Sequence, residues 1–301
     1  MNKKTKINTW IIGCGNTGQR VSKLLQKKSI NISATSHSSK SIKHLESLGV
    51  RVFPANLDEP TSLSKLDTNN ANIYYFAPPA PMGEKDQRMS NFLDSLDSGS
   101  PPKRIVYIST SGVYGDHNGE WITEQTTAAP HNARSKRRLH AEELIKQFCD
   151  DHSTEYMILR VAGIYDFKKL PLNRIDAGLK VLKADIAPAS NRIHGADLAN
   201  ICLAAMQSEH SNDTFNVADG NPSSITDYFI QTARLFSLTL PQEISWTKAQ
   251  DELSPEMLSY LTESKKIDAT YMLDKLGISL LYPTLAEGLV ACKREYDEQI
   301  E

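Results

Sequence analysis

Long apolar runs, an excess of one charge and closely spaced cysteines are all missing from this 301-residue sequence. The apolar run Trp10-Ile11-Ile12 ends at Gly13, which is too short for a signal peptide or a membrane span. Lys and Arg number 34 against 36 Asp and Glu, so the net charge of −2 gives no basic field for nucleic acid or a membrane surface. The four cysteines form no C-x-x-C pair, so neither a zinc site nor a disulfide framework is indicated. We therefore expect a cytoplasmic protein with reduced thiols, no metal, no nucleic-acid partner and no membrane partner.

Strand-like and helix-like segments alternate through the first half of the chain. This alternation predicts an α/β fold with a Rossmann-type, doubly wound parallel sheet. The expected strands are residues 30–36, 50–53, 72–77, 104–109 and 154–160, and the clearest helices are 39–48, 86–96 and 132–148. A long loop at 111–130 interrupts the pattern, which loosens beyond residue 165. We expect an NAD(P)-binding domain at 1–165 and a mixed region at 166–301, in which a smaller substrate-binding cap is interleaved with the last sheet strands.

The first apolar run breaks into a glycine-rich turn and then becomes helical. A G-x-G-x-x-G motif between a strand and a helix is typical of a dinucleotide-binding loop. Its first glycine permits the tight turn, the second lets a pyrophosphate approach the backbone, and the third lets the helix pack on the sheet. The free N–H groups of the helix then face the phosphates. The loop residues expected to bind cofactor are Gly13, Cys14, Gly15, Asn16, Thr17 and Gly18.

The segment after the second expected strand has no carboxylate. Enzymes specific for NAD place Asp or Glu there to bind the ribose 2′-hydroxyl, whereas this chain has Ser36, His37 and Lys40. Hydroxyls and an ammonium group can instead bind a 2′-phosphate, which favours NADP(H) over NAD(H). A simpler interpretation is that these residues only cap the next helix.

A more specific pattern appears in residues 107–116, Y-I-S-T-S-G-V-Y-G-D. This segment resembles the S-T-x-x-V-Y-G signature of the extended short-chain dehydrogenases/reductases, the NAD-dependent epimerase/dehydratase family. Similar matches follow in family order at 159–165, 192–198, 215–217 and 275–289. The resemblance implies that Thr110 is catalytic, that Asn56 and Leu57 contact the adenine, and that Ala77 and Pro78 lie against the cofactor. A plainer interpretation of Thr110 is a strand-end cap.

The chain departs from this family at the catalytic tyrosine. The family's Y-x-x-x-K motif falls at residues 132–136, where Lys136 is present but Asn132 replaces the tyrosine. The resemblance implies that Lys136 holds the nicotinamide ribose, although a solvated lysine is the alternative. An amide has no proton to exchange near neutral pH, so another group must replace the phenol. His131, Tyr114 and Tyr165 are the candidates. The alternative is that His131 is only a surface histidine and that the two tyrosines only pack in the protein interior. Atypical family members also lack this tyrosine.

Two functions are consistent with these features. The first is an NAD(P)-dependent oxidoreductase or epimerase that acts on a nucleotide-sugar-like or other polar carbonyl or alcohol compound. The second is a non-catalytic NADP(H)-binding sensor or regulatory protein, because Asn132 removes the usual acid. The resemblance also makes a homodimer an expected assembly.

Overall fold

The computed structural model describes residues 8–64 and 66–300. The chain forms two compact units, each built from separate stretches of sequence. The first contains residues up to 113 together with 128–160 and 198–215. The second contains 114–127, 161–197 and the chain from 216 onward. The segment at 114–127, expected as a loop, therefore belongs to the second unit.

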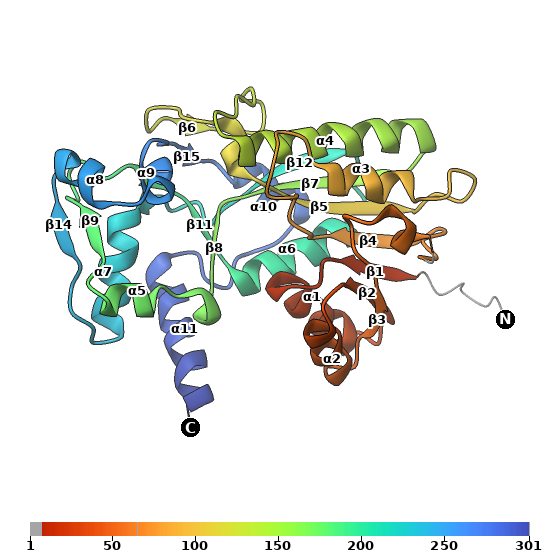
Figure 1. Ribbon diagram of the computed structural model, residues 1–301, viewed down its shortest axis with the longest axis horizontal. Helices are drawn as coiled ribbons and strands as arrows, with labels where there is room; N and C mark the ends of the chain where they lie inside the picture. The colour runs from red at the N-terminus through yellow and green to blue at the C-terminus, as the bar shows by residue number, and fades with distance from the viewer. Residues whose placement is uncertain (1–7, 65, 301) are drawn as a thin grey trace. The chain divides into compact units, whose positions relative to one another are not determined.

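A seven-stranded sheet forms the framework of the first unit (Figure 1). The strand order is β12-β7-β5-β4-β1-β2-β3, with the direction of winding reversing beside β1. The described registers of β1 with β2 and β4, of β2 with β3, and of β4 with β5 are all parallel. The strands are β1 (Thr9–Ile12), β2 (Ile32–Ser36), β3 (Arg51–Pro54), β4 (Asn72–Tyr75), β5 (Arg104–Thr110), β7 (Glu155–Val161) and β12 (Asp213–Val217). This arrangement confirms the predicted doubly wound α/β fold.

Helices cover both faces of this sheet because its central strands are apolar on both sides. Helices α3 and α4 lie on one face, and α1 and α6 on the other (Figure 1). On the first face, Tyr75, Phe92 and Ile145 belong to one buried cluster. The helices are α1 (Asn16–Lys27), α2 (Ser39–Ser47), α3 (Gln87–Asp94), α4 (Ala133–His152) and α6 (Gly195–Gln207). Between β3 and β4 the chain forms a short 3-10 turn, η1 (Pro60–Leu63).

The second unit contains small two-stranded sheets and short helices. The segment expected as a loop at 111–130 holds η2 (Ser111–Tyr114) and strand β6, which pairs with the distant β15. The strands are β6 (Trp121–Ile122), β8 (Gly163–Tyr165), β9 (Lys180–Leu182), β10 (Ala189–Ser190), β11 (Arg192–His194), β13 (Ser223–Ser224), β14 (Gln242–Ile244) and β15 (Lys266–Ile267). The helical segments are η3 (Phe167–Lys169), α5 (Leu172–Asp176), α7 (Ile225–Leu235), α8 (Trp246–Glu252), α9 (Pro255–Leu261), α10 (Thr270–Leu276) and α11 (Leu285–Ile300).

Candidate functional site

The glycine loop lies between β1 and α1, as the motif predicts. Gly13 adopts a φ of +84°, and a Cβ there would lie 2.5 Å from the backbone nitrogen of Ala77. The Gly13 amide also donates to the Thr35 hydroxyl over 3.3 Å. A Cβ on Gly18 would press on Ile11 at 3.1 Å, so this glycine lets α1 pack against β1. The loop is thus fixed by its neighbours on β2 and β4.

The outer side of the loop has the space and polarity that a dinucleotide needs. A Cβ built on Gly15 meets no atom within 4 Å. Gly15 is the N-cap of α1 and has no side chain to cap it, so the first N–H groups of the helix can face a phosphate. The Cys14 thiol is buried, and this burial raises the pKa of Cys14 to about 12. Cys14 is therefore an inert thiol, and a cofactor contact at this position would use its backbone.

The end of β2 combines hydroxyls and cations. Ser38 caps α2 by accepting a hydrogen bond from the Ser41 amide, which matches the capping interpretation for this one serine. Lys40 lies exposed in the first turn of α2, and His37 is exposed too. Asp58, after β3, is held by Arg88 at 2.6 Å, and this ion pair lowers the pKa of Asp58.

The segment after β3 forms a tight turn. The Asn56 side chain accepts from the Asp58 amide at 3.1 Å and donates to Glu59 at 3.1 Å. The neighbouring Leu57 packs at the edge of the buried cluster under α3. Asn56 thus shapes this turn, whereas contact with an adenine is an expectation from the resemblance. Pro78 follows Ala77, and its carbonyl accepts from Arg88 at 3.2 Å.

Thr110 ends β5 beside the first turn of α4. Its hydroxyl accepts from the Gly112 amide at 3.2 Å, which is the strand-end contact considered above. A Cβ on Gly112 would lie 2.7 Å from the Ser135 hydroxyl and 3.5 Å from that of Thr110. Thr110 and the start of α4 are therefore neighbours within the first unit.

Asn132 has a clear structural role. It is the N-cap of α4, and its side-chain oxygen accepts from the Ser135 amide at 2.9 Å. Asparagine is among the preferred N-cap residues, whereas tyrosine is not. The residue that stands in the tyrosine position therefore stabilises the helix that carries Lys136.

Lys136 is bound to a carboxylate that the sequence patterns did not indicate. Its ammonium nitrogen lies 2.7 Å from Oε1 of Glu84, and the side chains are 39% and 62% exposed. Glu84 belongs to no motif, and only the chain's path between β4 and α3 brings it to α4. Lys136 is therefore not simply a solvated lysine.

The three candidate replacement acids have different environments. His131 is exposed and immediately precedes the cap of α4. Tyr114 is fully buried in the second unit, where its hydroxyl donates to Asn216 at 2.8 Å. Tyr165 is buried there too, with its hydroxyl against Gly288 of α11. Burial raises the pKa of Tyr165 well above its ordinary value, which makes it a poor source of a phenolate.

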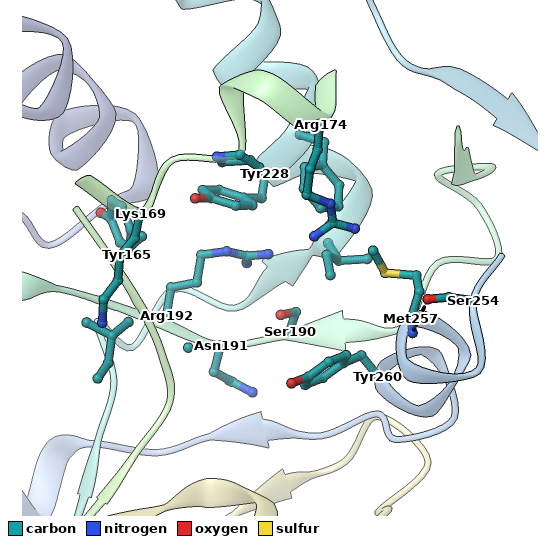
Figure 2. A pocket seen from close by; sticks show the side chains of 15 residues that line it. Tyr165, Lys169, Arg174, Ser190, Asn191, Arg192, Tyr228, Ser254, Met257 and Tyr260 are labelled. Carbon is teal, nitrogen blue, oxygen red and sulfur yellow. Dashed lines mark hydrogen bonds between the residues drawn. The ribbon is translucent and has the colours of Figure 1, made fainter. Parts of the chain in front are cut away.

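The second unit contains a cavity of about 730 Å³. Figure 2 shows Arg192 extending across this cavity below Tyr228, with Arg174 opposite. The described lining contains the cations of Lys169, Arg174 and Arg192 and no carboxylate. The rings of Tyr165, Tyr228, Phe229 and Tyr260 also line it. Sequence reasoning missed this cavity, because its residues come from seven short elements.

Arg192 is the buried cation of this cavity. It is 6% exposed, and its two described hydrogen bonds go to neutral oxygens, the Ser223 hydroxyl at 3.2 Å and the Ser224 carbonyl at 3.4 Å. The guanidinium carbon also lies 4.6 Å from the centre of the Tyr228 ring. Burial lowers the pKa of Arg192, since the charged group loses water. A buried guanidinium held by neutral groups favours an anionic ligand.

Asp219 is a buried acid near this cation. Burial raises the pKa of Asp219 to about 6, and the Arg192 charge partly opposes that rise. Its Oδ1 accepts from the Asn221 amide at 3.0 Å, while Oδ2 has no hydrogen-bond partner among the described residues. Asp219 therefore offsets the Arg192 charge incompletely at mildly acidic pH.

Comparison of the whole sequence with known protein families shows which family the chain belongs to. The profile of the family described as NAD(P)H-binding matches residues 13–209, about two thirds of the chain. The chain belongs to this NAD(P)H-binding family. The match begins at the first glycine of the loop and includes Thr110, Asn132 and Lys136.

Solved structures of NAD-dependent epimerases share the fold. A UDP-glucose 4-epimerase from Thermotoga maritima, solved with UDP-glucose, has a TM-score of 0.80 at 16% identity over 98% of this chain and 100% of that one. A UDP-glucuronic acid 4-epimerase from Bacillus cereus, solved with NAD, has a TM-score of 0.75 at 15% identity over 98% and 99%. A functionally unknown protein from Silicibacter pomeroyi has a TM-score of 0.80 at 24% identity over 96% and 98%. These likenesses show that the chain has the same Rossmann-type α/β fold as these epimerases, as the motifs predicted.

A curated relative matches a shorter stretch. UDP-arabinose 4-epimerase 1 from Arabidopsis thaliana is 28% identical over 122 residues, which is 36% of this chain. The match spans 29% of that relative's own length. The chain thus covers less than a third of this relative's length, and it is the family profile that supports a nicotinamide cofactor.

Two features are absent from the described residues. Within residues 8–64 and 66–300, no helix is both long and apolar enough to cross a bilayer. The same residues contain no group of three His, Cys, Asp or Glu side chains that could hold a metal ion.

Proposed function

We propose that this chain is an NADP(H)-dependent oxidoreductase or epimerase that acts on a negatively charged, nucleotide-sugar-like or other polar carbonyl or alcohol compound. The observation that carries the proposal is the cationic cavity around Arg192 in the second unit. A protein that only senses a dinucleotide needs the glycine loop, whereas an enzyme also needs a place for its substrate.

The chemistry of this cavity suits such a substrate. Its volume of about 730 Å³ lies within the usual range for small-molecule sites. Arg192 and Arg174 can donate to phosphate or carboxylate oxygens, and the exposed Tyr260 offers an aromatic surface for a ring. The fold neighbours solved with UDP-glucose and UDP-glucuronic acid make nucleotide sugars the first compounds to test.

The cofactor assignment rests on the loop and on the end of β2. The residues proposed to hold a dinucleotide are those of the glycine loop, with Ser36, His37 and Lys40 toward the adenosine ribose. Residues 35–40 contain no Asp or Glu, so a 2′-phosphate bound there would lie beside hydroxyls and Lys40. This supports NADP(H) over NAD(H).

Thr110 and Lys136 are the proposed residues at the reacting end. Lys136 has N–H donors beyond the one used by Glu84 and can hold ribose hydroxyls. The Thr110 hydroxyl accepts from Gly112 and keeps its own proton to donate to a substrate oxygen. When bound, the nicotinamide supplies hydride transfer.

The sensor hypothesis remains the second candidate, because Asn132 caps α4 instead of carrying a proton. Under this hypothesis NADPH binds tightly and no compound turns over. Asn132→Tyr would then create activity that the natural protein lacks.

The test combines binding and turnover. Fluorescence titration with NADPH and NADH measures cofactor affinity, and chromatography follows UDP-glucose, UDP-glucuronic acid and 9,10-phenanthrenequinone. We expect turnover of at least one compound, with KM for an anionic substrate raised at least about tenfold in Arg192→Met, since one charged hydrogen bond is lost. Lys183→Met, an exposed cation of the same unit, is the matched control. NADPH binding with no turnover of any compound would instead support the sensor.

A cytoplasmic location and a homodimer stay predictions. Light scattering after size-exclusion chromatography measures the assembly directly.

A further inference from the structure

Two hydrogen bonds hold the segment that links β4 to α3 against the first turns of α4. Arg137 donates to the Gly83 carbonyl at 2.5 Å, and the Nδ1 atom of His140 accepts from the Asp86 amide at 3.2 Å. Glu84 lies between these two anchored positions and reaches Lys136 at 2.7 Å. Backbone anchors on both sides therefore hold this carboxylate next to the lysine.

The same turn of α4 borders Thr110. Ser135, the neighbour of Lys136, lies close enough to Gly112 to meet a Cβ there at 2.7 Å, and Thr110 lies 3.5 Å from the same point. Thr110 and the Lys136–Glu84 ion pair therefore both border the start of α4 within the first unit. These are the side chains that the proposed reaction would use.

Two other polar side chains near α4 already have structural partners. The Asn132 amide caps α4. The Tyr107 phenol is fully buried and accepts from Arg138 at 3.3 Å, and burial raises the pKa of Tyr107. Glu84, in contrast, is 62% exposed, so a ligand can reach it and its proton can exchange with water.

We propose that Glu84 is the catalytic acid/base of this protein and replaces the tyrosine of the family. This proposal rests on the proposed function. Lys136 then has two tasks, because one N–H orients the Glu84 carboxylate while the others remain for the ribose. The ion pair takes the place of the usual tyrosine–lysine pair.

In both alcohol oxidation and carbonyl reduction, the proton and the hydride each have a donor and an acceptor. During oxidation of an alcohol, its O–H bond breaks and the proton passes to the Glu84 carboxylate. Its C–H bond breaks with the electron pair, which leaves as hydride to the oxidised nicotinamide, and the C=O bond forms. During reduction, hydride adds to the carbonyl carbon and the Glu84 carboxylic acid returns the proton to the oxygen.

The test compares Glu84→Gln and Glu84→Ala with the natural protein on the three compounds named above. General acid/base groups contribute about 10²- to 10⁴-fold, so we expect kcat/KM to fall at least about 100-fold in both variants. Added formate should restore part of the activity of Glu84→Ala by supplying the missing carboxylate, and it should not help Glu84→Gln. Asp94→Asn, which removes an exposed carboxylate from α3, is the matched control and should keep full activity.

Two readouts do not depend on turnover. The NADPH dissociation constant of Glu84→Gln should stay within about threefold of the natural value, because an exposed ion pair contributes little. Labelling of Lys136 by trinitrobenzenesulfonate, followed by peptide mass spectrometry, should become faster when its partner is removed.

Three results would overturn the proposal. Natural kcat/KM in Glu84→Gln would show that another group moves the proton. Loss of activity without formate rescue and with weaker NADPH binding would assign Glu84 a structural role. If the natural protein binds NADPH but converts none of the compounds, the proposed function itself fails, and the role of Glu84 falls with it.

Discussion

Gly13 and Gly15 are two residues apart, yet they serve different purposes. Gly13 has a positive φ, and any side chain there would collide with Ala77. Gly15 has an extended backbone at φ −77° and open space where a Cβ would be. The fold therefore requires the first glycine, and we predict that cofactor binding requires the second.

Alanine at each position should separate these requirements. Gly13→Ala forces a left-handed backbone and a clash, so we expect a loss of about 2–4 kcal/mol in the free energy of unfolding. Gly15→Ala should change this free energy by less than about 1 kcal/mol and weaken NADPH binding at least about tenfold. Urea unfolding and NADPH fluorescence measure the two effects. Equal losses of stability, or natural NADPH affinity in Gly15→Ala, would contradict this assignment.

One residue, Asn132, stabilises the start of helix α4. The helix begins at Ala133, which places Lys136 in the first turn, and the Asn132 cap satisfies an amide that would otherwise lack a partner. The tyrosine of the family is thus replaced by a residue that suits this helix start.

Changes at Asn132 should therefore alter stability according to capping ability. We expect Asn132→Ala to lower the free energy of unfolding by about 1 kcal/mol, and Asn132→Ser to keep it within a few tenths. Thermal and urea unfolding of the two variants provide the measurement. A serine variant as unstable as the alanine variant would show that the cap is not what the asparagine supplies.

The sequence predicted elements well where periodicity is local. The fourth and fifth strands, the glycine loop and α4 follow from alternating or helical apolar patterns and from local breakers. Pairing of β6 with β15 joins residues that are far apart in the chain, so no local pattern could indicate it. For the same reason Glu84 was not foreseen, because its meeting with Lys136 depends on how the β4–α3 segment packs on α4.

At the scale of the whole molecule, each unit contains residues for one part of the proposed reaction. The first holds the glycine loop, Thr110 and the Lys136–Glu84 ion pair. The second holds the cationic cavity around Arg192. The predicted division at residue 165 runs along the sequence, whereas these units exchange segments at several points.

The central claim is that a bound cofactor is used for chemistry and not only sensed. Its most direct test is transfer of deuterium from NADPH, with each of the two C4 hydrogens labelled in turn, to the carbonyl carbon of a polar ketone or aldehyde, followed by mass spectrometry of the alcohol, whose new C–D bond does not exchange with water. We predict deuterium in the product with the natural protein and at least about 100-fold less transfer with Glu84→Gln. Tight NADPH binding without deuterium in any product would contradict the account.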